Sequence, residues 1–274
     1  MAMAKRIWTT PREKDLGLSR IENATGLAIS VLPNGALFAI EHRREEGVTV
    51  LNQFLGSPLA QNVTRIYLRP EGLQPHAIPG GHGETESRFG AAADHFLWEG
   101  RVPALRYHLT LSLHPSRSAW LWELEVRNEG EARRQVDAIL IEDIGLGDRG
   151  FLMNNEAYAS QYIDHHVARH PLYGPVVMSR QNLSQGGKNP WIALGCLEGA
   201  SSFATDGKEI FGPGFRDSSS FPLAFGESLP NRRLQHEFAC VALQAREKII
   251  WLVLTPIFAA IGGIIAGFFI GGGS

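Results

Sequence analysis

The feature that most constrains this chain is an alternation of apolar and polar residues with a period of two. The stretches LRYHLTLSLHP and AWLWELEVRN both follow it over their whole length. Successive side chains of a β-strand point to opposite faces, so this period predicts strands with one apolar face. The apolar positions are Leu105, Tyr107, Leu109, Leu111 and Leu113 in the first stretch and Trp120, Trp122, Leu124 and Val126 in the second.

Turn residues separate these runs and predict hairpins. Pro115 lies between the two stretches above, and Pro33-Asn34-Gly35 separates the runs LAISVL and ALFAIEHR. Further strands are expected in QVDAILIEDIGL, SSFATDGKEIFG and LQHEFACVALQ, and no well-capped amphipathic helix precedes the C-terminal region. Only paired sheets bury so many one-sided apolar faces, so residues 1–245 are predicted to form one all-β, antiparallel sandwich domain.

Composition and charge narrow the class of partner. The chain has 274 residues, of which 44% are hydrophobic and 20% charged, and its formal net charge is −2. Such a chain has no excess of positive charge to neutralise a phosphate backbone, so nucleic acid is not expected as a partner. Cys196 and Cys240 are the only cysteines, and their spacing predicts buried thiols in a reducing, cytoplasmic compartment.

The C-terminal region, residues 246–274, departs from the globular pattern. The run 249–270 reads IIWLVLTPIFAAIGGIIAGFFI and contains no charge, which predicts a hydrophobic helix long enough to cross a membrane. Gly263 and Gly267 have the GxxxG spacing of closely packed helices. Arg246 and Lys248 precede the run, so the domain before it would be anchored at the cytoplasmic face. The terminal GGGS is also typical of a linker, which leaves a non-native tail as an alternative.

Two polar motifs are expected to have structural roles and not catalytic ones. The loop-like stretch PGGHGETESRFG, residues 79–90, lacks the Gly-Lys-Ser/Thr of a phosphate-binding loop, and its alternation favours a solvated sheet face, with a sugar or partner surface as the alternative. Glu142 and Asp143 are adjacent on a predicted strand. Their side chains should point to opposite faces, so they are not expected to act as a catalytic pair of carboxylates.

The stretch NNEAYASQYIDHHVARHP, residues 154–171, gathers polar and aromatic side chains. It has neither an HExxH spacing for a metal nor a GxSxG nucleophile, so no metal ligand and no catalytic residue is assigned to it. Aromatic faces stack on sugar rings, and amides, carboxylates and imidazoles bond to hydroxyls. We therefore predict contact with carbohydrate through Tyr158, Gln161, Tyr162, Asp164 and His165.

Several separate motifs carry a resemblance to a known family. They are IENATGLAISVLPNGALFAIEHR, NQFLGSPL, GGHGETESRFG, RYHLTLSLHPSRSAWLWELEVRNEG, NNEAYASQYIDHH, SRQNLSQGGKNPWIALGCLEG and FATDGKEIFG. Over residues 17–245 the chain resembles the N-terminal module of glycoside hydrolase family 94, in the branch of 1,2-β-oligoglucan phosphorylases and cyclic β-1,2-glucan synthases. The resemblance implies a β-supersandwich of the galactose-mutarotase-like type.

The resemblance also implies a function. Full family enzymes cleave a β-glucosidic bond with inorganic phosphate as co-substrate, and their catalytic acid lies on an (α/α)6 barrel that follows the sandwich. We expect no such barrel here, hence no catalytic residue, no cofactor and no turnover by the isolated chain. In family homodimers, sandwich loops help to close the neighbouring subunit's sugar subsites. The expected partners are therefore a β-linked gluco-oligosaccharide and a second copy of the chain, with residues 154–166 as one wall of a composite site.

Two other functions are weighed against this one. The first is a non-catalytic glucan-binding or assembly module that is tethered to a membrane through residues 249–270. The second is an aldose epimerase-like enzyme, because that fold relative works on sugars with His and Glu or Asp side chains alone. Membrane fractionation would test the first, and polarimetry on glucose or galactose would test the second.

Overall fold

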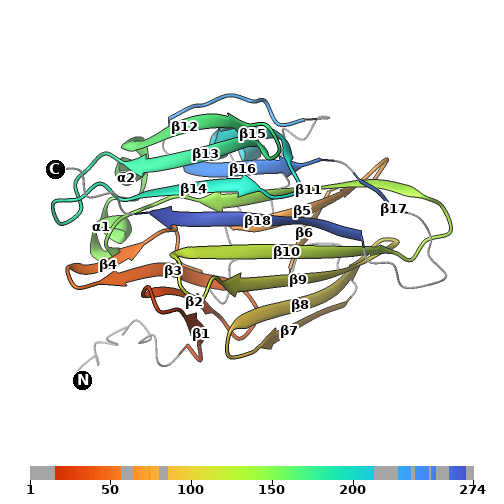
Figure 1. Cartoon of the computed structure of the whole chain (residues 1–274), viewed down its shortest axis with the longest axis horizontal. Coiled ribbons are helices and arrows are strands. Elements are labelled where there is room, and N and C mark those ends of the chain that lie inside the picture. The colour runs from red at the N-terminus through yellow and green to blue at the C-terminus, as the bar shows by residue number, and fades with distance from the viewer. Residues whose placement is uncertain are drawn as a thin grey trace, which may run out of the picture.

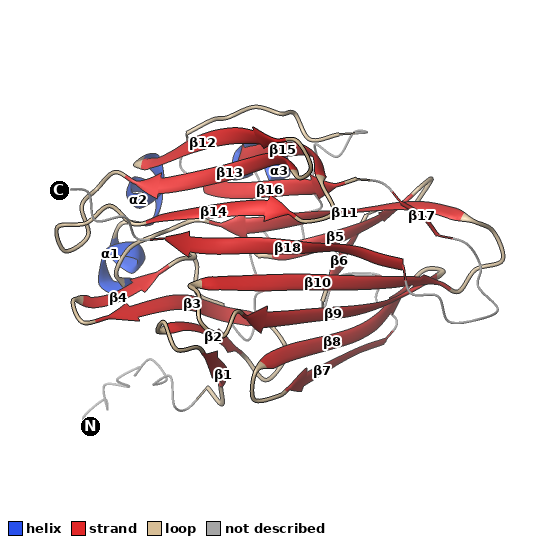
Figure 2. Ribbon diagram, in the orientation of Figure 1, coloured by secondary structure: helices blue, strands red, loops and turns tan. Residues whose placement is uncertain are grey.

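The structure is a computed structural model, and it describes residues 16–56, 64–73, 75–79, 86–212, 228–235, 238–246, 248–250 and 259–269. Strands make up most of this part of the chain, and its helices are short (Figure 2). The strands form three sheets in which every pair between named strands is antiparallel. The prediction of a mainly antiparallel β fold is therefore confirmed.

The largest sheet has eight strands in the order β12-β13-β14-β18-β10-β9-β8-β7 and lies in the foreground of Figure 1. Its strands cover Ile163–His170 (β12), Gly174–Gln181 (β13), Trp191–Cys196 (β14), Ala259–Phe269 (β18), Ala119–Asn128 (β10), Leu105–Leu113 (β9), His95–Val102 (β8) and Glu86–Ala91 (β7). The stretches LRYHLTLSLHP and AWLWELEVRN are thus neighbouring strands, with Trp122 opposite Leu111 in the register.

A six-stranded sheet lies behind it and a four-stranded sheet joins at one end (Figure 1). The six-stranded sheet contains Ala200–Asp206 (β15), Ala239–Ala245 (β16), Arg134–Asp143 (β11), Arg65–Pro70 (β5), His76–Ile78 (β6) and, paired to β11, Lys248–Ile250 (β17). The four-stranded sheet contains Ser19–Glu22 (β1), Leu27–Val31 (β2), Leu37–Arg44 (β3) and Gly47–Val50 (β4). The helices are Arg149–Asn154 (α1), Glu156–Gln161 (α2) and Gly207–Phe211 (α3).

The main core lies where the apolar faces of the sheets meet. Strand β10 shows the pattern most clearly, since Trp120, Trp122, Leu124 and Val126 are all at most 3% exposed, whereas Glu123 on the same strand faces solvent. Burial of one large apolar side chain contributes about 1.5–3 kcal/mol, so this alternation fixes which face of the strand points inward. The predicted one-sided strands are confirmed here.

Strand β11 is buried on both faces. Leu140 belongs to the core between the sheets, while Ile139 and Ile141 belong to a second cluster on the opposite face. Phe211 of α3 and Phe238 cover that second face, with ring centroids 6.1 Å apart. Burial on both faces explains why the four residues 138–141 of this strand, AILI, are all apolar and do not alternate with polar residues.

The predicted turn at Pro33-Asn34-Gly35 is present between β2 and β3. Gly35 has a φ of 83°, and a Cβ there would lie 2.7 Å from Trp98 Nε1. The Trp98 indole instead donates a hydrogen bond to the Gly35 carbonyl at 3.0 Å. Glycine is required at this position by both the backbone angle and the close approach of the indole.

The expectation of a C-terminal helix is wrong for the described part of the run 249–270. Ala259–Phe269 is strand β18, which pairs with β10 on one side and β14 on the other. Uncharged runs occur in strands at the centre of a sheet as well as in membrane helices, so lack of charge alone did not separate the two. In the described segments no helix has the length and apolarity needed to span a membrane. Residues 251–258 and 270 lie outside the described residues.

The sheets also include residues from both sides of the expected domain limit at 245, because β17 and β18 pair with sandwich strands.

The three short helices were not expected at all. Each has only five or six residues, too few to show a helical period in the sequence. The solvated sheet face predicted within residues 79–90 is confirmed for residues 86–90, which belong to the mostly exposed edge strand Glu86–Ala91, while residues 80–85 lie outside the described residues. Cys196 and Cys240 are buried and form no disulfide in the described part of the chain, as predicted.

Candidate functional site

The predicted sugar-contact stretch lies at one end of the sandwich, where the chain passes from β11 through α1 and α2 to β12 (Figure 1). Helix α1 starts because the Asp148 carboxylate accepts a hydrogen bond from the Phe151 N–H at 2.9 Å. Arg149 then pairs with the buried Glu41 of β3 at 2.8 Å. These contacts attach the first helix to the four-stranded sheet.

Helix α2 is held in place by hydrogen bonds near its C-terminal end. The hydroxyl of the fully buried Ser160 donates to Gln53 Oε1 at 2.5 Å and accepts the Ala239 N–H at 3.1 Å. The Gln181 side chain donates to the Ala159 carbonyl at 3.2 Å. Buried polar groups that are satisfied in this way hold a surface segment in one position. The outward side chains of α2 are therefore presented on a fixed base.

Two tyrosines form what we call the aromatic ledge, consisting of Tyr158 of α2 and Tyr162 just after it. Tyr158 is 50% exposed, and the ring centroids of the pair lie 4.9 Å apart at 59°. A hydrogen bond to Tyr158 raises the pKa of the Tyr162 hydroxyl. Gln161 is exposed beside them, and its carbonyl accepts a hydrogen bond from Gln235 at 2.7 Å. The ledge therefore offers aromatic surface and polar groups to solvent together.

The side chains of Asp164 and His165, at the start of β12, have different surroundings. Asp164 is exposed to solvent, while His165 is only 1% exposed and points into the sandwich. Its Nδ1 pairs with Ser179 Oγ at 2.8 Å, its Nε2 is buried without a hydrogen-bond partner among the described residues, and burial lowers its pKa to about 4. Consecutive strand residues face opposite ways, so His165 is removed from the predicted sugar-contact set.

The three histidines of the stretch do not converge. His166 and His170 are exposed on β12, and His170 Nδ1 accepts backbone N–H groups of Leu172 and Tyr173 at 3.2 and 3.3 Å. Among the residues that the structure describes, no group of three or more His, Cys, Asp or Glu side chains is arranged to hold a metal ion.

Glu142 and Asp143 form a buried acidic pair at the end of β11. They are 2% and 1% exposed, and the Thr64 hydroxyl contacts both, at 2.9 Å from Glu142 Oε1 and 3.3 Å from Asp143 Oδ1. Burial, reinforced by the Asp143 charge, raises the pKa of Glu142 to about 8, and burial raises that of Asp143 to about 6. Neither carboxyl group is accessible to a ligand, so the pair belongs to the core.

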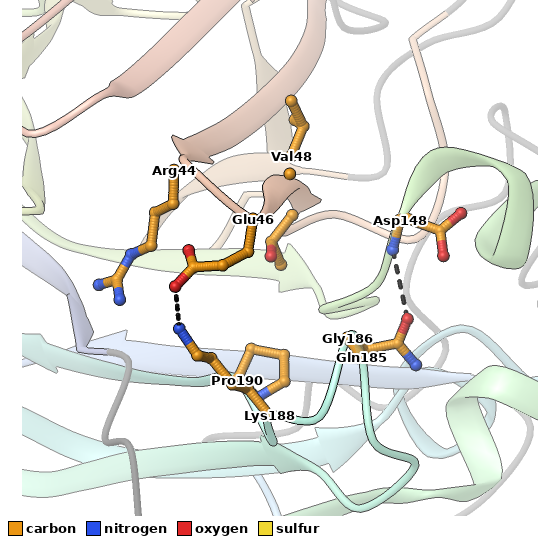
Figure 3. A pocket seen from close by; sticks show the side chains of 10 residues that line it. Arg44, Glu46, Val48, Asp148, Gln185, Gly186, Lys188 and Pro190 are labelled. Atoms are coloured by element: carbon orange, nitrogen blue, oxygen red, sulfur yellow. Dashed lines mark hydrogen bonds and ion pairs between the residues drawn. The ribbon is translucent and has the colours of Figure 1, made fainter.

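A pocket of about 240 Å³ opens beside the start of α1, and Figure 3 shows side chains that line it. We call it the hairpin pocket, because the turn between β3 and β4 forms one wall and the loop 182–190 between β13 and β14 forms the other. Lys188 and Glu46 join these walls through an ion pair at 2.5 Å, which lowers the pKa of Glu46. Sequence reasoning missed this pocket.

The loop 182–190 contacts both the pocket and the ledge segment. Gln185 Oε1 accepts the Asp148 N–H at 3.4 Å at the start of α1, as drawn in Figure 3. The Asn182 N–H donates to the Tyr162 carbonyl at 2.9 Å. The hairpin pocket and the aromatic ledge therefore share one supporting loop and form a single polar and aromatic end of the sandwich.

Solved structures place this architecture among sandwich domains of larger proteins. A bacterial glucoamylase complexed with acarbose matches 91% of this chain with a TM-score of 0.53 and 10% identity, over 32% of its own length. A polysaccharide lyase matches 90% with a TM-score of 0.54 and 10% identity, again over 32% of its length. At this identity the likeness concerns the fold alone. The fold and the surface described above thus define a β-sandwich domain with a polar, aromatic end.

The sequence comparisons are more specific. Residues 30–250 match the family of the SOGP N-terminal domain, and the chain belongs to that family. It is 31% identical over 196 residues to 1,2-beta-oligoglucan phosphorylase of Listeria innocua, which covers 71% of this chain and 17% of the relative. The chain therefore spans about a sixth of the length of that enzyme. The resemblance to family 94 drawn from the sequence motifs is confirmed.

Proposed function

We propose that this chain acts as the glucan-contacting sandwich domain of a 1,2-β-oligoglucan phosphorylase-type enzyme and does not break bonds itself. Membership of the SOGP N-terminal domain family carries this proposal. The exposed aromatic ledge supports it, because tyrosine rings stack on the C–H faces of sugars while Gln161 and Asp164 beside them can bond to hydroxyls. In this proposal the sandwich is of the galactose-mutarotase-like type, and the catalytic acid belongs to a helical barrel.

The ligand is a β-linked gluco-oligosaccharide, and the ledge is one wall of a site that another domain completes. A wall of this kind stacks two rings and bonds few hydroxyls, so its affinity alone is low. In family enzymes the other wall comes from a neighbouring subunit. We accordingly propose a cytoplasmic homodimer, whose mass in solution light scattering can measure directly.

Titration calorimetry with a β-1,2-linked gluco-oligosaccharide tests the ledge. Tyr158→Ala removes one stacking ring worth about 1 kcal/mol, so we expect roughly fivefold weaker binding. Tyr173→Ala is the matched control, because Tyr173 stacks on His170 in the turn between β12 and β13, away from the ledge. Equal affinity of wild type and Tyr158→Ala would remove the ledge from the proposed function.

A second assay tests the lack of turnover. The purified chain is incubated with the oligosaccharide and inorganic phosphate, and release of glucose 1-phosphate is followed. We expect no product above the blank, because bond cleavage requires a proton donor in contact with the glycosidic oxygen. The buried Glu142 and Asp143 cannot reach a ligand. Sustained release of product by this chain would show that the acid is present in it.

A further inference from the structure

We propose that the hairpin pocket binds one neutral sugar ring, as a subsite distinct from the aromatic ledge. The inference rests on the proposed function only in its choice of glucose as the sugar. The pocket is built from three segments far apart in the sequence, namely the β3–β4 turn, the start of α1 and the loop 182–190. Figure 3 shows these walls facing one another across the opening.

The charges of the walls select a neutral ligand. Arg44 and Lys188 contribute two positive charges, and Glu46 and Asp148 contribute two negative charges. Lys188 is already neutralised by Glu46 at 2.5 Å. With that pair formed, Arg44 and Asp148 leave one charge of each sign in the lining, so neither an anion nor a cation gains a net attraction. A neutral, polar molecule meets no such penalty.

The walls still hold hydrogen-bonding capacity. The Thr49 hydroxyl has no hydrogen-bond partner among the described residues, and Asp148 uses Oδ1 to cap α1, which leaves Oδ2 available. Glu46 bonds to Lys188 through Oε1 and keeps Oε2. Sugar hydroxyls both donate and accept, so they can use a hydroxyl and two carboxylate oxygens at the same time.

The remaining lining is apolar or open. Val48 and Pro190 supply C–H surface, which suits the apolar face of a sugar ring. Gly47 and Gly186 have φ angles of 142° and 58°, and no atom lies within 4 Å of the place a Cβ would occupy at either. The backbone at these two glycines is therefore open to a ligand. This mixture of polar edges and small apolar surfaces matches a carbohydrate better than a purely apolar molecule.

The size of the pocket limits the ligand to a single ring. Its volume of about 240 Å³ lies below the roughly 300–1,000 Å³ of sites that enclose drug-sized ligands. One ring with few hydrogen bonds gains little over the cost of immobilisation, so we expect a dissociation constant on the order of 1 mM. Such weak binding calls for a method that reports on individual residues at high ligand concentration.

Amide chemical shifts of the full chain during a titration with glucose provide the test. We expect the amides of Gly47, Gly186 and Lys188 to shift. Thr49→Val removes one hydroxyl without changing the shape of the side chain, and we expect it to weaken glucose binding at least threefold. Thr110→Val is the matched control, since Thr110 is a half-exposed strand residue on β9, and it should leave the affinity unchanged. The spectra of both variants also report that they are folded.

Three results would overturn the inference. The first is an unchanged glucose affinity in Thr49→Val, and the second is no shift of pocket amides in the wild type. The third is a shift of the same amides by inorganic phosphate or glycerol at concentrations equal to or below those of glucose, which would indicate an anion site or unspecific hydroxyl binding. If any of these occurs while Tyr158→Ala still weakens oligosaccharide binding, the proposed function stands and only the pocket inference fails.

Discussion

Replacing Glu142 by glutamine should stabilise this sandwich at neutral pH and have little effect at pH 5. Glu142 is 2% exposed, its Oε2 has no hydrogen-bond partner among the described residues, and its only hydroxyl contact is Thr64. Trp122 lies beside it and lowers its pKa slightly, but burial and the Asp143 charge dominate and raise the pKa to about 8. The folded state therefore keeps a proton that the unfolded state releases near its ordinary pKa of 4.5.

The sign and size of the effect follow from proton linkage. Between pH 4.5 and about 8 the folded state binds more protons than the unfolded state, so this group's contribution to stability is lost as pH rises. Each pH unit within this window lowers the free energy of unfolding by about 1.4 kcal/mol. From pH 5 to pH 7.5 the loss is about 3 kcal/mol. Glutamine stays neutral throughout, so the Glu142→Gln variant escapes this loss.

Urea unfolding of wild type and Glu142→Gln at pH 5.0, 6.0, 7.0 and 7.5 measures the difference directly. The free energy of unfolding of the variant, minus that of the wild type, should increase by about 3 kcal/mol over this series. Comparing the two chains cancels the contribution of His165, which also titrates, and the difference reports Glu142 together with its interaction with the Asp143 charge. Glu123→Gln, on the exposed face of β10, should differ from wild type by less than about 0.5 kcal/mol at every pH. Parallel stability curves for wild type and Glu142→Gln would refute the reasoning.

Three further predictions concern other buried or constrained positions. The ring of His165, whose pKa burial lowers to about 4, should stay neutral down to pH 5 in a carbon-detected NMR titration, and a midpoint near 6.5 would contradict its buried position. Glu41→Gln removes a carboxylate charge that pairs with both Arg20 and Arg149, and it should lower the free energy of unfolding by about 1–3 kcal/mol. Glu45→Gln, at an exposed position on the same hairpin, is the control and should cause no measurable change. Gly174→Ala places a Cβ 2.1 Å from the Ala200 carbonyl at a φ of 70°, so thermal unfolding should show a loss of more than about 2 kcal/mol.

The sequence predicted well those strands that have one apolar side and one solvent-facing side. Strands β9 and β10 follow the alternation residue by residue. The strand β18 was missed for the opposite reason. Its uncharged run has no period of two, and its length together with its lack of charge favours a membrane helix. Pairing on both sides with β10 and β14 is a tertiary fact that a local pattern does not contain.

The candidate site was predictable only in part. Tyr158 and Asp164 are exposed and Tyr162 is partly exposed at the predicted stretch, but His165 is buried, because consecutive strand residues point to opposite faces. The hairpin pocket could not be found from the sequence. Its walls are more than a hundred residues apart and meet only when the β3–β4 turn packs beside the loop 182–190.

A crystal structure of this chain with a β-1,2-linked gluco-oligosaccharide tests the central claim most directly. The claim is that the α1–α2 end of the sandwich contacts glucan. We predict sugar density against the rings of Tyr158 and Tyr162, within hydrogen-bond distance of Gln161 or Asp164. Density confined to the opposite end of the sandwich, or to the outer face of β7 to β10, would contradict it.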